Sequence, residues 1–223
     1  MSSAKNKVPL RTLQYIGILR LASKLTGFNL LNGCGKMALD VGCGSGKRLL
    51  ALSLLGYDVY GFDVSAEAVR EAYKLGFQRK VLQWDVEESI PFNEEFDLVT
   101  CFSVLEHLYH PQRALTNILA IKPKILLIDV PNRHTEFLRL IYLILKGEKI
   151  TITLSRGDGF LLKDADHVNV KTTSQWLRLI HTTLYKFPEM RVLTSTNYVM
   201  PFPHITFTLP YLGSSMLIII GRK

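Results

Sequence analysis

The residues most suited to chemistry form a glycine-rich turn in the first quarter of the chain. The turn follows a short apolar run and reads Asp40-Val41-Gly42-Cys43-Gly44-Ser45-Gly46. Glycine has no side chain, so it allows unusual backbone angles and lets a ligand approach the main chain closely. Three glycines at alternate positions after a strand therefore predict a binding site for a nucleotide-like ligand.

Two phosphate-binding patterns fail at this turn. A dinucleotide site has the pattern G-x-G-x-x-G/A, and here Lys47 stands where the third small residue belongs. A mononucleotide loop has the pattern G-x-x-x-x-G-K-[ST]. The run that begins at Gly42 is one residue too short for it, and Arg48 replaces the hydroxyl residue. The pattern acid-x-G-x-G-x-G, which begins at Asp40, matches a third kind of site.

Strands and helices alternate around the turn, which predicts crossover connections and a parallel sheet. The strands are continuous apolar runs, as expected when helices cover both faces. We therefore expect a doubly wound α/β fold with a mostly parallel, seven-stranded sheet. The expected strands are 37–41, 58–63, 80–84, 96–102, 125–130, 191–199 and 216–221. The expected helices are 9–26, 47–55, 65–75, 111–121, 135–146 and 173–181.

The length of 223 residues fits one domain. Within it we expect a helical cover at residues 1–30, a cofactor-binding half at 31–131 and an acceptor-side half at 132–223. The loop-rich stretch 147–170 is expected to form a lid over the active site.

Two further carboxylates follow the expected strands. Asp63 ends the second strand, 23 residues after Asp40, where it can accept hydrogen bonds from both hydroxyls of a ribose. Asp85 follows the third strand. In this order, the motifs resemble those of the class I S-adenosylmethionine-dependent methyltransferases, and more narrowly the small-molecule enzymes of ubiquinone and menaquinone biosynthesis. The resemblance is good over residues 36–131 and weak in the C-terminal third.

The resemblance implies S-adenosylmethionine as the cofactor and S-adenosylhomocysteine as the product. It gives Asp85 the adenine amino group and the Val86 backbone amide a ring nitrogen. It also places the segment 102–108 along the cofactor. The residues expected to bind the cofactor are Asp40, Gly42, Cys43, Gly44, Gly46, Asp63, Val64, Asp85, Val86, Phe102 and Ser103.

Methyl transfer from a sulfonium is an in-line displacement, and it needs a base only when the acceptor must lose a proton. His107 follows the fourth strand, near the expected position of the methyl group, and His167 resembles an acceptor-pocket position. These two are the candidate catalytic residues. Structural roles are favoured for the four other polar or aromatic candidates, Tyr15, His110, Asp129 and Asn132.

The acceptor is not identified by the sequence. The N-P-P-[FY] motif of enzymes that methylate base amino groups is absent, and Phe102-Ser103-Val104-Leu105 stands in its place. A small-molecule acceptor is therefore expected. The net charge of +8 keeps open an RNA or protein acceptor, although the basic residues are scattered. A cofactor-binding protein without turnover also stays open, while aminopropyl transfer is disfavoured because no paired carboxylates are seen for a polyamine.

The three cysteines, Cys34, Cys43 and Cys101, are odd in number and form no C-x-x-C pair. A disulfide framework and a metal site are therefore not expected, and the protein is expected in the reducing cytoplasm. No apolar run approaches the roughly 20 residues that span a bilayer. The oligomeric state is left open.

Overall fold

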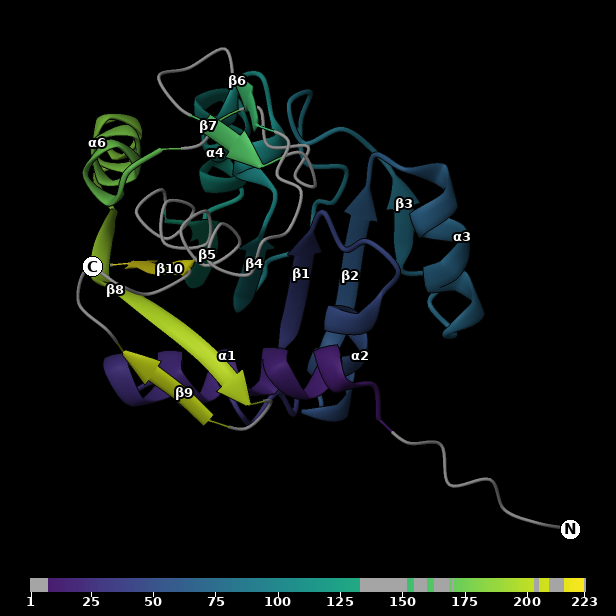
Figure 1. The fold of residues 1–223 in the computed structure, drawn as a ribbon. Coiled ribbons are helices and arrows are strands. Elements are labelled where there is room, and N and C mark those ends of the chain that lie inside the picture. The colour runs from purple at the N-terminus through teal and green to yellow at the C-terminus, as the bar shows by residue number, and fades with distance from the viewer. Residues whose placement is uncertain are drawn as a thin grey trace, which may run out of the picture.

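The computed structural model describes residues 8–132, 152–154, 160–162, 169, 171–202, 205–208 and 215–222. In these ranges the main sheet has eight strands in the order β3-β2-β1-β4-β5-β10-β8-β9 (Figure 1). The strands are β1 (Met37–Val41), β2 (Asp58–Asp63), β3 (Val81–Gln83), β4 (Leu98–Phe102), β5 (Ile125–Pro131), β8 (Met190–Phe202), β9 (Ile205–Thr208) and β10 (Ser215–Arg222). The seven expected strands are confirmed, and β9 adds an eighth at the edge.

The order of the strands reverses at β1. Strand β1 pairs in parallel with β2 on one side and with β4 on the other. The parallel part continues through β3 and β5, and β10 lies antiparallel between β5 and β8. In open α/β sheets, ligands bind outside the carboxyl ends of the strands at such a reversal. The glycine-rich turn follows β1 at this point.

Helices cover both faces of the sheet. Helices α1, α2 and α3 contribute to the core on one face, and α4 and α6 to the core on the other. Together with a short 3-10 helix η1, the described helices are α1 (Leu10–Thr26), α2 (Lys47–Leu54), α3 (Ala66–Lys74), η1 (Leu105–His107), α4 (Pro111–Ala120) and α6 (Thr173–Leu184). The expected helix 135–146 lies outside the described residues.

Local sequence sets the helix ends. The Ser65 side chain accepts a hydrogen bond from the Ala68 N–H at the start of α3, as its place before the helix predicts. Thr172 and Gln175 form a reciprocal capping box at the start of α6. Gly27 ends α1 in the left-handed conformation.

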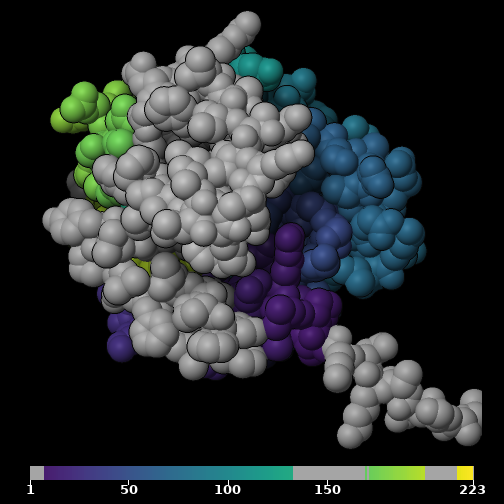
Figure 2. Space-filling model, viewed as in Figure 1, coloured from purple at the N-terminus to yellow at the C-terminus, as the bar shows by residue number. Residues whose placement is uncertain are grey.

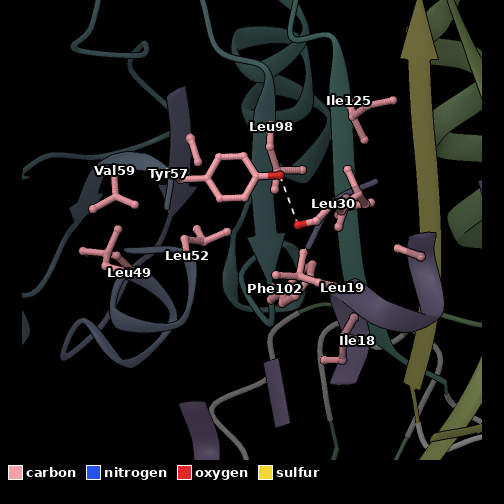
Figure 3. Packing of buried hydrophobic residues seen from close by; sticks show 14 of the residues in the cluster. Ile18, Leu19, Leu30, Leu49, Leu52, Tyr57, Val59, Leu98, Phe102 and Ile125 are labelled. Carbon is pink, nitrogen blue, oxygen red and sulfur yellow. Dashed lines mark hydrogen bonds between the residues drawn. The ribbon is translucent and has the colours of Figure 1, made fainter. Parts of the chain in front are cut away.

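Successive side chains of a strand point to opposite faces of the sheet, so each strand contributes to both cores. In β5, Leu127 packs with the core beneath α1 and α2, and Ile128 packs with the core beneath α4 and α6. Figure 3 shows part of the first core, where Leu19, Leu49 and Leu52 of the helices meet the sheet. Because both faces are buried, the strands read as continuous apolar runs in the sequence.

The expected lid, 147–170, is described only in part. Strands β6 (Ile152–Leu154) and β7 (Phe160–Leu162) pair antiparallel in a sheet of their own. Near the end of the segment, the Asn169 N–H donates to the Glu106 carbonyl at 2.8 Å, and the Asn169 side chain donates to the Leu108 carbonyl. That a lid closes over the site stays a prediction. No helix in the described ranges has the length and apolar character needed to cross a membrane.

Candidate active site

A hollow of about 400 Å³ opens at the carboxyl ends of the parallel strands. It lies at the reversal of strand order, where the glycine-rich turn meets the segments that follow β2, β3 and β4. Its lining consists of Gly42, Phe62, Asp63, Val64, Trp84, Asp85, Val86, Glu87, Ser103, Val104, His107, Leu108 and Tyr109.

The glycine-rich turn needs glycine for two different reasons. Gly42 has a φ of 65°, and a Cβ at this position would overlap the Val104 side chain. Gly44 has a φ of 54°, but a Cβ there would meet no atom within 4 Å. The first glycine therefore allows close packing against the segment after β4. The second leaves open space beside the main chain, as a cradle for a ligand requires.

Asp63 is held rigidly at the end of β2. Its Oδ2 accepts the Gly44 N–H at 2.8 Å, and its Oδ1 accepts the Ser65 N–H at 2.9 Å. These bonds tie the carboxylate to the glycine-rich turn and to the start of α3. A carboxylate oxygen has more than one acceptor position, so both oxygens can still accept a hydroxyl from a ligand in the hollow.

The segment after β3 brings two carboxylates to the wall. Asp85 Oδ1 accepts the Glu87 N–H at 2.8 Å, which folds the segment into a turn. Glu87 Oε1 in turn accepts the His110 N–H at 3.0 Å. His110 stands at the N-cap of α4, so the expectation that it starts a helix is confirmed. The buried Val86 lies between the two acids, and its carbonyl accepts the Asn117 side chain at 2.8 Å.

Asp40 lies beneath the hollow and not on its wall. It is fully buried and accepts hydrogen bonds from Arg48 Nε at 2.9 Å and from Thr100 Oγ1 at 2.8 Å. Arg48 also donates to the Phe102 carbonyl at 2.7 Å and to the Gly42 carbonyl. The guanidinium lies over the Tyr15 ring of α1, 5.3 Å from its centroid. Arg48 therefore joins the ends of β1 and β4 to the glycine-rich turn.

Ser103 connects the wall to a buried carboxylate. It has a φ of 54°, which is uncommon for a residue with a side chain, and its N–H donates to the Asp129 carbonyl at 2.9 Å. Asp129 Oδ1 accepts the Tyr198 hydroxyl at 2.9 Å. Burial raises the pKa of Asp129 to about 6, while the Tyr198 hydroxyl and the charge of Arg48 act to lower it.

The short helix η1 carries His107 on the wall and Glu106 in the interior. His107 is exposed, and its N–H donates to the Val104 carbonyl at 2.9 Å. Glu106 is only 1% exposed, and its Oε2 has no hydrogen-bond partner in the described part of the chain. Burial raises the pKa of Glu106 to about 8, so this acid is mostly neutral at pH 7.

The structure separates the predicted residues into three groups. Those on the wall of the hollow are Gly42, Asp63, Val64, Asp85, Val86, Ser103 and His107. Those in the turn or beneath the wall, but not in the lining, are Asp40, Cys43, Gly44, Gly46 and Phe102. His167 lies outside the described residues. Of the residues considered structural, Tyr15 and Asp129 pack behind the wall and Asn132 is fully buried.

Sequence reasoning missed four residues of the lining, which are Phe62, Trp84, Glu87 and Tyr109. Val104 and Leu108 belong to the segment 102–108, which the resemblance placed along the cofactor. Trp84 and Glu87 flank the Asp85-Val86 pair, so their nearness to a predicted site was an available signal. Nothing in the sequence pattern distinguishes Tyr109, because a turn after η1 places it.

The charge of the hollow is opposite to that of the whole chain. The chain carries +8, yet the lining holds three carboxylates, Asp63, Asp85 and Glu87, and no lysine or arginine in the part that the structure describes. A carboxylate-lined hollow with an open glycine cradle suits a ligand that bears hydroxyls and positive charge. These residues therefore fit S-adenosylmethionine, which has a ribose, an ammonium and a sulfonium. Asp63 would hold the ribose hydroxyls, and the Asp85–Val86 segment the adenine.

Comparison with known proteins agrees with this fit. Residues 39–123 match the family model described as a methyltransferase domain. The ubiquinone biosynthesis O-methyltransferase of Coxiella burnetii is 30% identical over 187 residues, which cover 76% of this chain and 78% of that protein. A second relative, the mitochondrial ubiquinone biosynthesis O-methyltransferase of Candida albicans, is 40% identical over 95 residues, or 39% of this chain and 29% of that protein.

Among solved structures, magnesium protoporphyrin IX methyltransferase from Synechocystis PCC 6803, with S-adenosylhomocysteine bound, aligns with a TM-score of 0.60 and 16% identity. The alignment covers 96% of this chain and 83% of that one. At this identity the likeness concerns the fold. The family model, the Coxiella burnetii relative and the geometry of the site agree. The chain belongs to the class I S-adenosylmethionine-dependent methyltransferases, in the family of the ubiquinone biosynthesis O-methyltransferases.

Proposed function

We propose that this S-adenosylmethionine-dependent methyltransferase methylates a hydroxyl group of a small molecule. The observation that carries the proposal is the wall beyond the residues assigned to the cofactor, which consists of Ser103, Val104, His107, Leu108 and Tyr109 and holds no lysine or arginine in the described lining. A site that accepts a nucleic acid needs cations to neutralise phosphates, and the described part of this wall offers none. The names of the relatives, which are O-methyltransferases of ubiquinone biosynthesis, support a hydroxyl acceptor.

Bound S-adenosylmethionine supplies a methyl group that its sulfonium already activates. The chain's own contribution is to orient the reactants and to exclude water. The glycine-rich turn, Asp63 and the Asp85–Val86 segment are proposed to hold the cofactor. Ser103 and His107 lie on the wall beyond them, where a hydroxyl acceptor can donate a hydrogen bond. His107 stays the candidate base in the described part of the chain, and His167 stays a candidate outside it.

The experiment pairs small acceptors with a macromolecular one. The protein is incubated with S-adenosylmethionine and either catechol, 3,4-dihydroxybenzoate or bulk RNA, and methylated products are measured by mass spectrometry. The proposal expects a methyl ether on a small phenol and no methylated nucleotide. The variant His107→Gln tests the candidate base. It should bind S-adenosylhomocysteine normally and lose turnover.

RNA is the second candidate acceptor, because the net charge of +8 favours polyanions. A solved small RNA methyltransferase also shares the fold, with a TM-score of 0.66 and 18% identity over the whole of this chain and 26% of that one. Methylation of RNA in the same assay would replace the small-molecule proposal. Binding of S-adenosylhomocysteine without methylation of any acceptor in a total metabolite extract would instead favour a protein without turnover.

We further propose that the enzyme works in the cytoplasm. All three cysteines, Cys34, Cys43 and Cys101, are free thiols, which is usual for a reducing compartment. Fractionation of the source cells with an antibody against this chain tests the location.

A further inference from the structure

A second hollow, of about 530 Å³, opens at the amino ends of the parallel strands, opposite the active site. Residues that directly precede strands form much of its wall: Lys36 before β1, Tyr57 before β2, Asp97 before β4 and Lys124 before β5. Arg222 completes it as the last residue of the antiparallel β10. The strands themselves lie between this hollow and the active site, so the two are separate.

Two of the three cations of this hollow donate to carbonyl oxygens. Lys36 Nζ donates to the Asn32 carbonyl at 2.9 Å, and Arg222 Nε donates to the Lys122 carbonyl at 3.1 Å. Carbonyl oxygens are neutral, so they fix the two heads and leave the positive charge. Of the three cations in the described lining, Lys124 forms an ion pair, with Nζ 2.6 Å from Asp97 Oδ1, and the charge of Lys36 also acts to lower the pKa of that carboxyl. Three cations therefore share one anion.

Apart from Asn29, the rest of the lining is aliphatic or aromatic. Tyr57, Leu30 and Ile125 are each 5–6% exposed and form a packed base, in which the Tyr57 hydroxyl donates to the Leu30 carbonyl at 3.1 Å (Figure 3). Phe28 lines the same hollow and leaves 48% of its surface exposed. A half-exposed aromatic ring beside positioned cations offers one ligand both an apolar contact and a charged contact.

We propose that this hollow binds a small amphipathic anion, with its phosphate or carboxylate at Lys36, Lys124 and Arg222 and its apolar body against Phe28. Charge-assisted hydrogen bonds from preplaced cations recognise the acidic group, and the aromatic surface selects ligands with an apolar part. The site is independent of the methyl acceptor and lies at the opposite end of the strands. Its occupant is a ligand other than the cofactor.

The test uses phenyl phosphate as the probe and calorimetry at low ionic strength on the full-length protein. Saturable binding of one equivalent is expected. Inorganic phosphate, which lacks the apolar body, and benzyl alcohol, which lacks the charge, should bind more weakly, and added salt should weaken phenyl phosphate. No saturable binding at millimolar phenyl phosphate would overturn the proposal. Binding only to vesicles that contain phosphatidylglycerol would also overturn it, because the anion would then belong to a membrane surface.

Two variants of the lining should change the affinity for phenyl phosphate in opposite directions. Residues with a merely structural role would not produce this pattern. Arg222→Glu should weaken the binding of phenyl phosphate about tenfold, because a charge-assisted contact is lost. Asp97→Asn keeps an acceptor for the Met37 N–H, which bonds Oδ2 at 2.9 Å, but removes the competing anion, so affinity should rise. Arg70→Glu makes the same charge change on the exposed face of α3 and serves as the matched control. Binding of S-adenosylhomocysteine reports that each variant is folded.

Equal losses in Arg222→Glu and Arg70→Glu would show a general charge effect and reject the site. Weaker binding in Asp97→Asn would also reject it, because the carboxylate would then be a ligand and not a competitor.

Discussion

Asp63 is the residue that we propose to hold the ribose of the cofactor, on the wall of the hollow. The Gly44 and Ser65 amides fix its two oxygens, so the carboxylate needs no reorganisation when a ribose arrives. Asp63→Ala should weaken the binding free energy of S-adenosylhomocysteine by roughly 1.5–3 kcal/mol, because charge-assisted hydrogen bonds are lost. Calorimetry measures this change. Asp58→Ala, at the exposed start of the same strand, is the matched control and should leave affinity unchanged. Unchanged affinity in Asp63→Ala would show that other residues hold the ribose.

Glu106 links stability to pH. Its pKa is raised by burial to about 8, so the folded state keeps a proton that the unfolded chain, with a pKa near 4.5, releases. The free energy of unfolding therefore falls as pH rises through this window, by up to about 1.4 kcal/mol per pH unit. The buried Asp129, with a pKa of about 6, acts in the same direction at lower pH. Between pH 6 and 8 the contribution of Glu106 therefore exceeds that of Asp129.

Glu106→Gln should make the fall between pH 6 and 8 shallower, and the variant should melt several degrees above the unchanged protein at pH 8. Thermal unfolding followed by circular dichroism across this interval measures it. Glu88→Gln, at an exposed position, is the control and should keep the original slope. Parallel curves for the Glu106 variant and the unchanged protein would mean that this carboxyl is ionised in the fold.

At the scale of elements, α2 clamps the two central strands. Arg48 in its first turn holds Asp40 of β1, the Gly42 carbonyl and the Phe102 carbonyl at the end of β4. Helix α1 closes over this point, where Thr12 Oγ1 donates to the Lys47 carbonyl at 3.2 Å. Figure 2 shows the surface of α1 beside the residues that follow β1.

Arg48→Met should lower the free energy of unfolding by about 3–5 kcal/mol, because the charge of Asp40 is then buried without a cation, with the Thr100 hydroxyl as its remaining side-chain donor. Adding Asp40→Asn should recover part of the loss, since no buried charge remains. Urea unfolding of the two single variants and the double variant measures the coupling. Lys47→Met removes a neighbouring charge and is the control, with a change of roughly 0.5 kcal/mol or less expected. Additive losses in the double variant would show that the pair is not coupled.

The elements that the sequence predicts well are those governed by local patterns. The apolar runs identify seven strands. Ser65 locates one helix start, and the pair Thr172 and Thr173 locates another, where the structure shows Thr172 as the cap, since side-chain caps act within a few residues. Strand β9 was missed because a four-residue strand forms through pairing with β8. In the site, Asp63 and Asp85 were found because they end strands or follow them. Tyr109 was not found, because the path of the chain after η1 decides its position.

Arg48 shows a different limit. The sequence marks it only as the residue that spoils a phosphate-binding pattern. Its partners are Asp40, eight residues earlier, and Phe102, 54 residues later. A contact across that separation follows from the pairing of β1 with β4, which no local pattern contains. Predicting it would have required the strand order first.

On the scale of the whole molecule, the two hollows at opposite ends of the parallel strands differ in charge. The active-site hollow is lined by three carboxylates, while the second hollow has three cations and one carboxylate in its described lining. The excess of basic residues therefore does not extend to the described wall of the cofactor site. The field at the active site favours cations even though the protein as a whole is basic.

This division predicts different salt responses for the cofactor and its product. S-adenosylmethionine carries one more positive charge than S-adenosylhomocysteine, and the carboxylates of the hollow attract that charge. Raising the ionic strength should therefore weaken the binding of S-adenosylmethionine more steeply than that of S-adenosylhomocysteine, because salt screens the extra attraction. Calorimetric titrations of both ligands over a series of salt concentrations measure the two slopes. Glu87→Gln removes one wall carboxylate and should bring the slopes closer together, whereas Glu88→Gln, at the neighbouring exposed position, should not. Identical slopes in the unchanged protein would show that the sulfonium does not sense the wall carboxylates.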